Sequence, residues 1–168
     1  MRRRDFLLAA ASAPWTAIAL ADEALTKVVH VVDGDTVYTF DGRHRRTVRI
    51  AAIDAPELAQ PFGHEAHNAL ATLCLHREVL VRTAKTDPYG RLVGTISMGD
   101  LDVGLAQVRA GLAWHFKRYA KEQSPLDRAL YADAEVDARR RRMGLWAEPA
   151  PVAPWDFRSR ARPVAHAP

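Results

Sequence analysis

Two acidic clusters interrupt a stretch of the chain that otherwise has the pattern of β-strands. One covers residues 33–35 (Asp-Gly-Asp), the other covers residues 54–57 (Asp-Ala-Pro-Glu), and Arg49 lies between them. Carboxylates that are buried together need a cation or a positively charged side chain beside them, because an uncompensated buried charge is costly. Hard divalent metals bind carboxylate oxygens, and an arginine can hold a phosphate through two parallel hydrogen bonds. The pattern therefore indicates metal-assisted chemistry on a phosphoester.

The first 21 residues have the features of an export signal. Three arginines at positions 2–4 precede an apolar run over residues 7–20, and residues 19–21 (Ala-Leu-Ala) form a small-residue cleavage site. A membrane anchor is the alternative, but the run is short for a span of about 20 residues and contains Pro14. We expect a cleaved twin-arginine leader over residues 1–21 and a periplasmic or secreted protein without stable membrane association.

The remaining residues amount to one domain. Without the leader the net charge falls from +4 to +2, so the overall charge argues only weakly for a nucleic-acid partner. The arginine-rich segments near the end of the chain argue for it better. Cys74 is the only cysteine, so no intramolecular disulfide can form, and its apolar, helix-like surroundings predict a core position.

The pattern of apolar residues and turns predicts five strands and about three helices. We expect strands over residues 25–32, 37–40, 47–53, 78–83 and 92–97, and helices over residues 63–75, 103–110 and 125–143. The last helix has a clear start, with Ser124 as the cap and Pro125 in the first turn. Strands and helices do not alternate regularly, which favours an α+β fold built on a five-stranded barrel of the oligonucleotide-binding (OB) type.

Two domain boundaries follow from this pattern. The folded domain is expected over residues 22–148, and residues 149–168 form a tail rich in proline and arginine that cannot build a core. We expect Trp155 to dock the first part of this tail.

Simpler explanations compete with a catalytic role at several positions. Residues 33–36 taken alone are equally well explained as a turn, and only the second acidic cluster shifts the balance. His64 and His67 invite a zinc site, but they are one residue short of the usual helical spacing and no third ligand is evident. The arginines at positions 139–142 are typical of a solvated helix end, which also leaves room for a secondary phosphate contact.

Five blocks of the chain resemble the staphylococcal nuclease (thermonuclease) family. They cover residues 33–37, 49–57, 87–91, 111–113 and 144–146, and the likeness extends over about residues 25–148. The order and spacing of five blocks are far more specific than any single motif. The resemblance implies an OB-fold phosphodiesterase that uses calcium.

Carried over by position, the acidic residues take defined roles. The resemblance implies that Asp35 and Asp54 bind calcium through their carboxylates and that Ala55 binds it through its backbone carbonyl. Ala55 stands where the founding enzyme has threonine, so any contact from a hydroxyl is lost. Glu57 would orient or deprotonate the attacking water, and Asp33 would support the ligands from outside the coordination sphere.

The basic and aromatic residues of the blocks would bind the substrate. Arg49 and Arg91 would hold the phosphate, where they stabilise negative charge that builds up on its oxygens in the transition state. Tyr89 and Tyr119 match positions at which the family contacts the terminal phosphate and base of the substrate. Lys117 stands where the founding enzyme has a second tyrosine, which puts the substrate preference in question.

Taken together, the sequence predicts a monomeric, calcium-dependent nuclease. It would hydrolyse DNA and RNA with little sequence preference and leave 3′-phosphate ends. The alternatives are a binding module of the same fold that no longer cleaves, and a zinc hydrolase centred on His64 and His67. The presence of both acidic clusters and of the two arginines argues against loss of catalysis.

Overall fold

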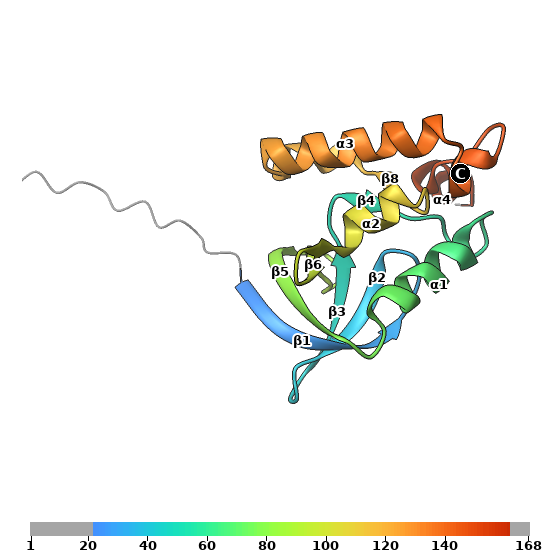
Figure 1. The fold of residues 1–168 in the computed structure, drawn as a ribbon. Helices are drawn as coiled ribbons and strands as arrows, with labels where there is room; N and C mark the ends of the chain where they lie inside the picture. The colour runs from blue at the N-terminus through green and yellow to red at the C-terminus, as the bar shows by residue number, and fades with distance from the viewer. Residues whose placement is uncertain (1–21, 162–168) are drawn as a thin grey trace, which may run out of the picture.

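The computed structural model describes residues 22–161, which form a closed β-barrel with helices packed around it (Figure 1). The main sheet has the strand order β3-β2-β1-β5-β6-β7. Its strands are β1 (Asp22–Val31), β2 (Thr36–Phe40), β3 (Arg45–Ile50), β5 (Glu78–Thr86), β6 (Leu92–Met98) and the short β7 (Leu101–Asp102). Because β3 also pairs in parallel with β6, the sheet closes on itself. The expected α+β fold with a five-stranded OB-type barrel is thereby confirmed.

One expected strand is interrupted. The sequence pattern predicts a continuous strand over residues 47–53, but β3 ends at Ile50 and a separate strand, β4 (Ile53–Asp54), pairs with β8 (Trp114–His115). Between them, Ala52 adopts a left-handed backbone conformation with φ of 67°. This conformation is unusual for a residue with a side chain, so apolar alternation alone did not reveal the turn.

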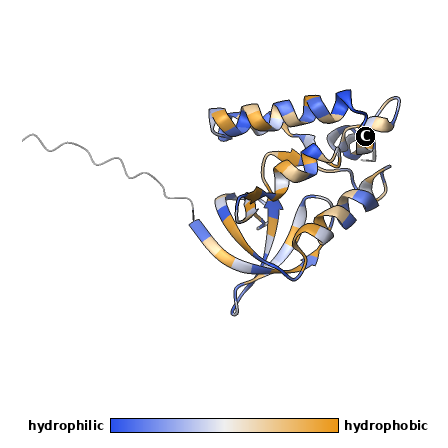
Figure 2. Ribbon diagram, in the orientation of Figure 1, coloured by the Kyte–Doolittle hydropathy of each residue, from blue (hydrophilic) through white to orange (hydrophobic). Residues whose placement is uncertain are grey.

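The barrel core consists of alternate strand residues, and α1 covers one side of it. Val28, Val48, Ile50 and Ile96 are fully buried inside the barrel. On α1 (Gly63–Cys74), the residues that face this core are Ala66, Leu70 and Cys74. The hydropathy colouring shows hydrophobic and hydrophilic residues in alternating bands along these elements (Figure 2). Cys74 thus has the core position that the sequence predicts.

Three further helices and two short 3₁₀ segments complete the described residues. They are α2 (Val103–Arg109), η1 (Lys117–Glu122), α3 (Pro125–Arg140), η2 (Gly144–Ala147) and α4 (Pro154–Ala161). The hydroxyl of Ser124 accepts a hydrogen bond from the backbone N–H of Asp127 at 3.0 Å, so the predicted cap of α3 is present. No helix within residues 22–161 is both long enough and apolar enough to span a bilayer.

Two glycine-containing segments far apart in the sequence meet beside α3. The backbone N–H of Leu145 donates to the carbonyl of Gly111 at 2.9 Å. Gly111 has φ of +68°, and a Cβ there would collide with the carbonyl oxygen of Met143. The resemblance blocks over residues 111–113 and 144–146 therefore form one packed junction, which anchors a small cluster around Trp146.

The C-terminal segment contains a helix that the sequence analysis did not anticipate. The segment after residue 148 has too few apolar residues to form a core, but α4 packs against the same end of the barrel as β4 and β8 (Figure 1). The ring of Trp155 stacks on Phe116 with centroids 5.4 Å apart and meets the edge of Trp114 at 5.5 Å. The predicted leader, residues 1–21, lies outside the described part of the chain.

Candidate active site

The loop that carries the first acidic cluster is pressed tightly against its neighbours. A Cβ on Gly34 would lie 2.6 Å from the methyl groups of both Ala55 and Ala66, so only glycine fits there. The buried side chain of Gln107 on α2 donates to the carbonyls of Gly34 and Ala66, each at 2.9 Å. These contacts fix the backbone immediately before Asp35.

Asp35 is held inside the barrel end by three groups. One carboxylate oxygen accepts from the hydroxyl of Thr36 at 2.9 Å, and the other accepts from the backbone N–H of Ala55 at 2.9 Å. The latter oxygen also lies 3.3 Å from Nη2 of Arg49. The first and second acidic clusters are therefore joined directly, although 20 residues separate them.

Arg49 links both carboxylates to the backbone. The Nη2 atom that reaches Asp35 also donates to Oδ1 of Asp54 at 2.9 Å, and Nη1 donates to the carbonyls of Ile50 and Ile53 at 2.9 and 3.0 Å. The left-handed turn at Ala52 makes this possible, because it folds β4 back toward β3. One nitrogen atom thus lies within 3.3 Å of oxygens from both acids.

Burial shifts the ionisation of these groups. It raises the pKa of the Asp54 carboxyl, and the hydrogen bond from Arg158 opposes that rise. Burial, together with the negative charge of Asp35, raises the pKa of Asp33 to about 6. For Arg49, burial opposes the charged form, but the charges of Asp35 and Asp54 prevail and raise its pKa.

Glu57 lies beside the same centre and shares a partner with it. Its Oε1 accepts from Arg158 of α4 at 2.6 Å, and the same guanidinium contacts both carboxylate oxygens of Asp54 at 3.2 and 2.8 Å. A cavity of about 380 Å³ opens next to these side chains, lined in part by Asp33, Glu57, Phe157 and Arg158. Of the second acidic cluster, Glu57 is therefore accessible from solvent on the side that α4 borders, whereas Asp54 is buried behind it.

The second predicted phosphate-binding arginine is placed differently. Arg91 pairs with Asp87 through its Nε at 2.7 Å, and the Tyr89 ring lies 5.5 Å from its guanidinium carbon and is 81 % exposed. Its backbone precedes β6, which pairs with the strand that carries Arg49, but the structure shows no contact between Arg91 and the acids among the described residues. The carboxylates and Arg49 converge, and Arg91 lies in the turn directly before the neighbouring strand.

Residues 117–119 lie on η1, outside the carboxylate centre. Tyr119 is 43 % exposed, and the amino group of Lys85 lies 4.5 Å from its ring centroid. Lys117 forms an ion pair with the buried Glu135 at 2.6 Å. This contact gives Lys117 a partner within the fold at the position where the founding enzyme has a tyrosine.

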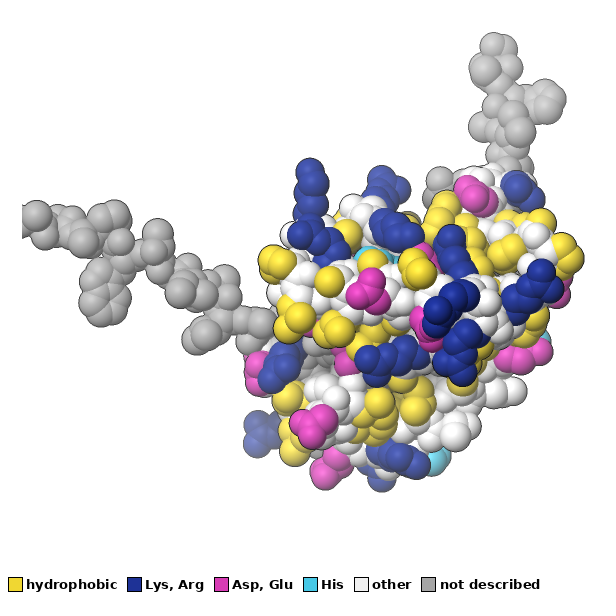
Figure 3. All heavy atoms as spheres, turned by 45° about the horizontal axis from the view of Figure 1, so that its top comes forward, with side chains coloured by type: hydrophobic (Ala, Val, Ile, Leu, Met, Phe, Trp, Pro, Cys, Tyr) yellow, Lys and Arg dark blue, Asp and Glu magenta, His cyan; other side chains and the backbone are white. Residues whose placement is uncertain are grey.

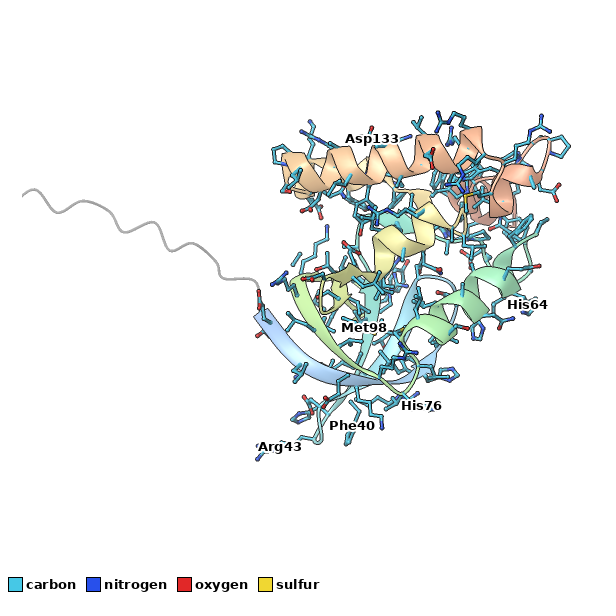
Figure 4. All side chains as sticks on the ribbon, viewed as in Figure 1. Phe40, Arg43, His64, His76, Met98 and Asp133 are labelled. Carbon is cyan, nitrogen blue, oxygen red and sulfur yellow. The ribbon has the colours of Figure 1, made fainter. Side chains whose placement is uncertain are left out.

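The histidines of α1 do not form a site with the acids. His64 points away from the barrel on the outer side of α1 (Figure 4). The ring nitrogens of His67 contact the side-chain oxygen of Asn68 at 3.0 Å and the carbonyl of Val31 at 3.3 Å. Within residues 22–161, no three His, Cys, Asp or Glu side chains are arranged to hold a metal ion.

The carboxylate centre nevertheless suits a hard cation. Its donors are all oxygens, its two aspartates are almost fully buried, and a single nitrogen of Arg49 already carries positive charge between them. Hard divalent ions such as calcium take oxygen ligands of this kind. The side chains of Asp35 and Asp54, with the carbonyl of Ala55, are therefore a chemically suitable donor set.

Two residues at this centre were not identified from the sequence. Gln107 lies within the helix predicted over residues 103–110, and the pattern assigns it no role. A glutamine between apolar positions is nevertheless a usable signal for a buried polar contact. Arg158 lies in the tail over residues 149–168, for which the sequence predicts no core of its own and no site residue. Only its proximity to Trp155, which was expected to dock, hinted that it comes close to the barrel.

Comparison with known proteins identifies the family. The profile described as staphylococcal nuclease homologue matches residues 47–148. The chain belongs to the staphylococcal nuclease family. Protein ParB of Escherichia coli is 34 % identical over 171 residues, with 94 % of each chain covered, and the micrococcal nuclease of Shigella flexneri is 36 % identical over 141 residues, with 79 % of each covered. An uncharacterized endonuclease of Escherichia coli O157:H7 is 35 % identical over 135 residues, covering 80 % of this chain and 84 % of the relative.

Family membership and these relatives make the chain a nuclease, that is, a hydrolase of nucleic acids. The alternative of a binding module without catalysis is therefore set aside. The carboxylates and arginine described above lie within or next to the matched segment.

Proposed function

We propose that this nuclease depends on calcium and hydrolyses phosphodiesters of DNA and RNA with little sequence preference, leaving 3′-phosphate ends. One observation carries the proposal: a single nitrogen of Arg49 lies within 3.3 Å of oxygens from both Asp35 and Asp54. Acids that are 19 residues apart in the sequence are thus gathered around one positive charge. A divalent ion bound there would polarise the phosphate and stabilise the charge that develops on it.

The protein's own groups supply the remaining chemistry. Arg49 is fixed by two backbone carbonyls, so it presents its charge in a constant position and loses little entropy when a phosphate arrives. Glu57 lines the cavity beside the acids, where a carboxylate can accept a proton from an attacking water. Arg91 pairs with Asp87 through its Nε alone, so its two terminal nitrogens can donate to a substrate phosphate.

The proposed low sequence preference follows from the chemistry of the groups that would contact the substrate. The groups proposed to act bind phosphate, which every nucleotide carries, and the exposed rings of Tyr89 and Tyr119 can stack on any base. Basic side chains also gather over the outer face of α3 (Figure 3), among them Arg128, Arg139 and Arg140. They would attract a polyanion without reading its sequence.

We further propose that the protein acts as a monomer in the periplasm or outside the cell. The basis is the twin-arginine leader pattern of residues 1–21 together with one cysteine that needs no disulfide partner. N-terminal sequencing of the mature protein tests the cleavage after residue 21. An N-terminus that still begins at Met1 would contradict it.

A digestion assay tests the proposed chemistry. Metal-stripped protein is mixed with plasmid DNA or with RNA, and calcium or zinc is added back separately. We expect cleavage with calcium only, and product ends that a polymerase extends only after phosphatase treatment. Arg91→Ala should lower the rate about 100-fold or more, as removal of similar electrostatic stabilisers does. Cleavage restored by zinc alone, or a fully active Arg91→Ala variant, would overturn the respective part of the proposal.

A further inference from the structure

Arg158 is the least expected member of the carboxylate centre. It comes from α4, more than 100 residues after the acids it contacts, and it bridges Asp54 and Glu57 with one guanidinium. The carboxylate of Asp54 is 1 % exposed, whereas the Arg158 side chain is 45 % exposed. A buried acid of the proposed metal site is therefore neutralised by a side chain that solvent can reach.

The helix that carries Arg158 is docked by contacts other than this ion pair. Trp155 packs against Phe116 and Trp114, and the side chain of Gln60 donates to the carbonyl of Val152 at 3.1 Å. The position of α4 thus rests on an aromatic cluster and a backbone contact. Exchange of Arg158 for a smaller residue should therefore leave α4 in place.

The two arginines at the centre differ in how firmly they are held. Arg49 is mostly buried and donates to two backbone carbonyls, so it cannot leave without leaving those carbonyls unpaired. Within the described part of the chain, the guanidinium of Arg158 donates to carboxylates alone, and it borders the cavity of about 380 Å³ beside them. It is the cation of this centre that can be exchanged.

A divalent ion and Arg158 have overlapping partners. An ion bound by Asp54 would take the oxygens to which Arg158 now donates, and the two positive charges would repel each other at that distance. The same guanidinium occupies Oε1 of Glu57, so this oxygen is not free to accept a proton from water while the ion pair persists. Metal binding and release of Arg158 are therefore expected to be coupled.

We propose that Arg158 is a built-in cation that competes with the divalent metal for Asp54, so that the C-terminal helix sets the metal affinity of the active site and keeps Oε1 of Glu57 occupied in the metal-free protein. This inference rests on the proposed metal dependence. It adds a residue outside the segment matched by the family profile, which ends at residue 148.

Titration calorimetry with calcium on the full chain tests the proposal. Arg158→Ala should bind calcium about tenfold more tightly than the unchanged protein or more, which corresponds to about 1.4 kcal/mol. Arg160→Ala, an exposed arginine on the same helix, is the matched control and should bind calcium like the unchanged protein. Circular dichroism confirms that each variant is folded.

Thermal unfolding supplies a second readout that a purely structural role of Arg158 would not produce. Without metal, Arg158→Ala should unfold at a lower temperature because Asp54 and Glu57 lose a partner, and saturating calcium should remove most of that difference. Equal or weaker calcium binding by Arg158→Ala would overturn the competition while leaving the metal site intact. Absence of calcium binding in every variant would instead refute the metal dependence itself, and the competition with it.

Discussion

Replacement of Arg49 by alanine should destabilise the fold as well as the chemistry. The guanidinium is 15 % exposed and contacts two carboxylates and two backbone carbonyls. In its absence Asp35 has no cationic partner described in the structure, and Asp54 keeps only Arg158. The carbonyls of Ile50 and Ile53 lose a donor as well.

The size of the effect follows from the burial of these acids. Removal of one partner from a buried ion pair costs about 3–5 kcal/mol, and the remaining contact of Asp54 with Arg158 places this variant near 3 kcal/mol. The loss should depend on pH. Burial already raises the pKa of Asp54 and Arg49 opposes that rise, so in the variant this pKa lies further above its unfolded value, and the deficit is largest at neutral pH and shrinks toward about pH 4 as Asp54 becomes protonated.

Urea unfolding in the presence of a chelator, followed by tryptophan fluorescence, measures this loss. With a slope of about 2 kcal/mol per molar urea, the midpoint should fall by about 1–2 M at pH 7. Arg46→Ala, which removes an exposed arginine from the same strand, should leave the midpoint nearly unchanged. An Arg49→Ala variant whose midpoint matches that of Arg46→Ala would refute the inference that this guanidinium compensates buried acids.

Three more changes probe other parts of the structure. Glu57→Gln should lower the cleavage rate about 100-fold or more and cost at most about 1 kcal/mol of stability through its half-exposed ion pair with Arg158, whereas the exposed Glu148→Gln should cleave normally in the same plasmid assay. Gly111→Ala should cost about 2–3 kcal/mol in urea unfolding, since φ is +68° and the new Cβ meets a backbone carbonyl, whereas Gly42→Ala meets no atom within 4 Å and should cost less. Cys74, whose pKa burial raises to about 11, should resist thiol reagents at pH 8 in the folded protein and react only after unfolding; rapid labelling of the native state would contradict its burial.

The barrel and its helices followed from local patterns in the sequence. Apolar alternation located the five strands, and Ser124 with Pro125 marked the start of α3, because these signals depend on neighbouring residues alone. The same signals do not predict the turn at Ala52, because this turn depends on contacts with residues far away in the sequence. The left-handed conformation of an alanine is stabilised by the surrounding structure, here by the pairing of β4 with β8. No local residue preference predicts this conformation.

The sequence predicts the part of the candidate site whose charged residues lie close together along the chain. Asp35, Arg49 and Asp54 were expected to converge, and the structure brings them together. The contacts of Gln107 and Arg158 depend on how helices far along the chain pack against the barrel, which composition does not reveal. The phosphate contact of Arg91 stays a prediction, since the structure shows only that its Nε pairs with Asp87.

The central claim is that the charge of Asp35, gathered with Asp54 around Arg49, performs the chemistry. The most direct test is calcium-dependent plasmid cleavage by Asp35→Asn, which preserves the shape of the side chain and removes its charge. Asp41→Asn, in the exposed turn between β2 and β3, is the matched control. The account predicts that cleavage by Asp35→Asn falls at least about 100-fold while the control stays active. Cleavage by Asp35→Asn at the rate of the unchanged protein would contradict it.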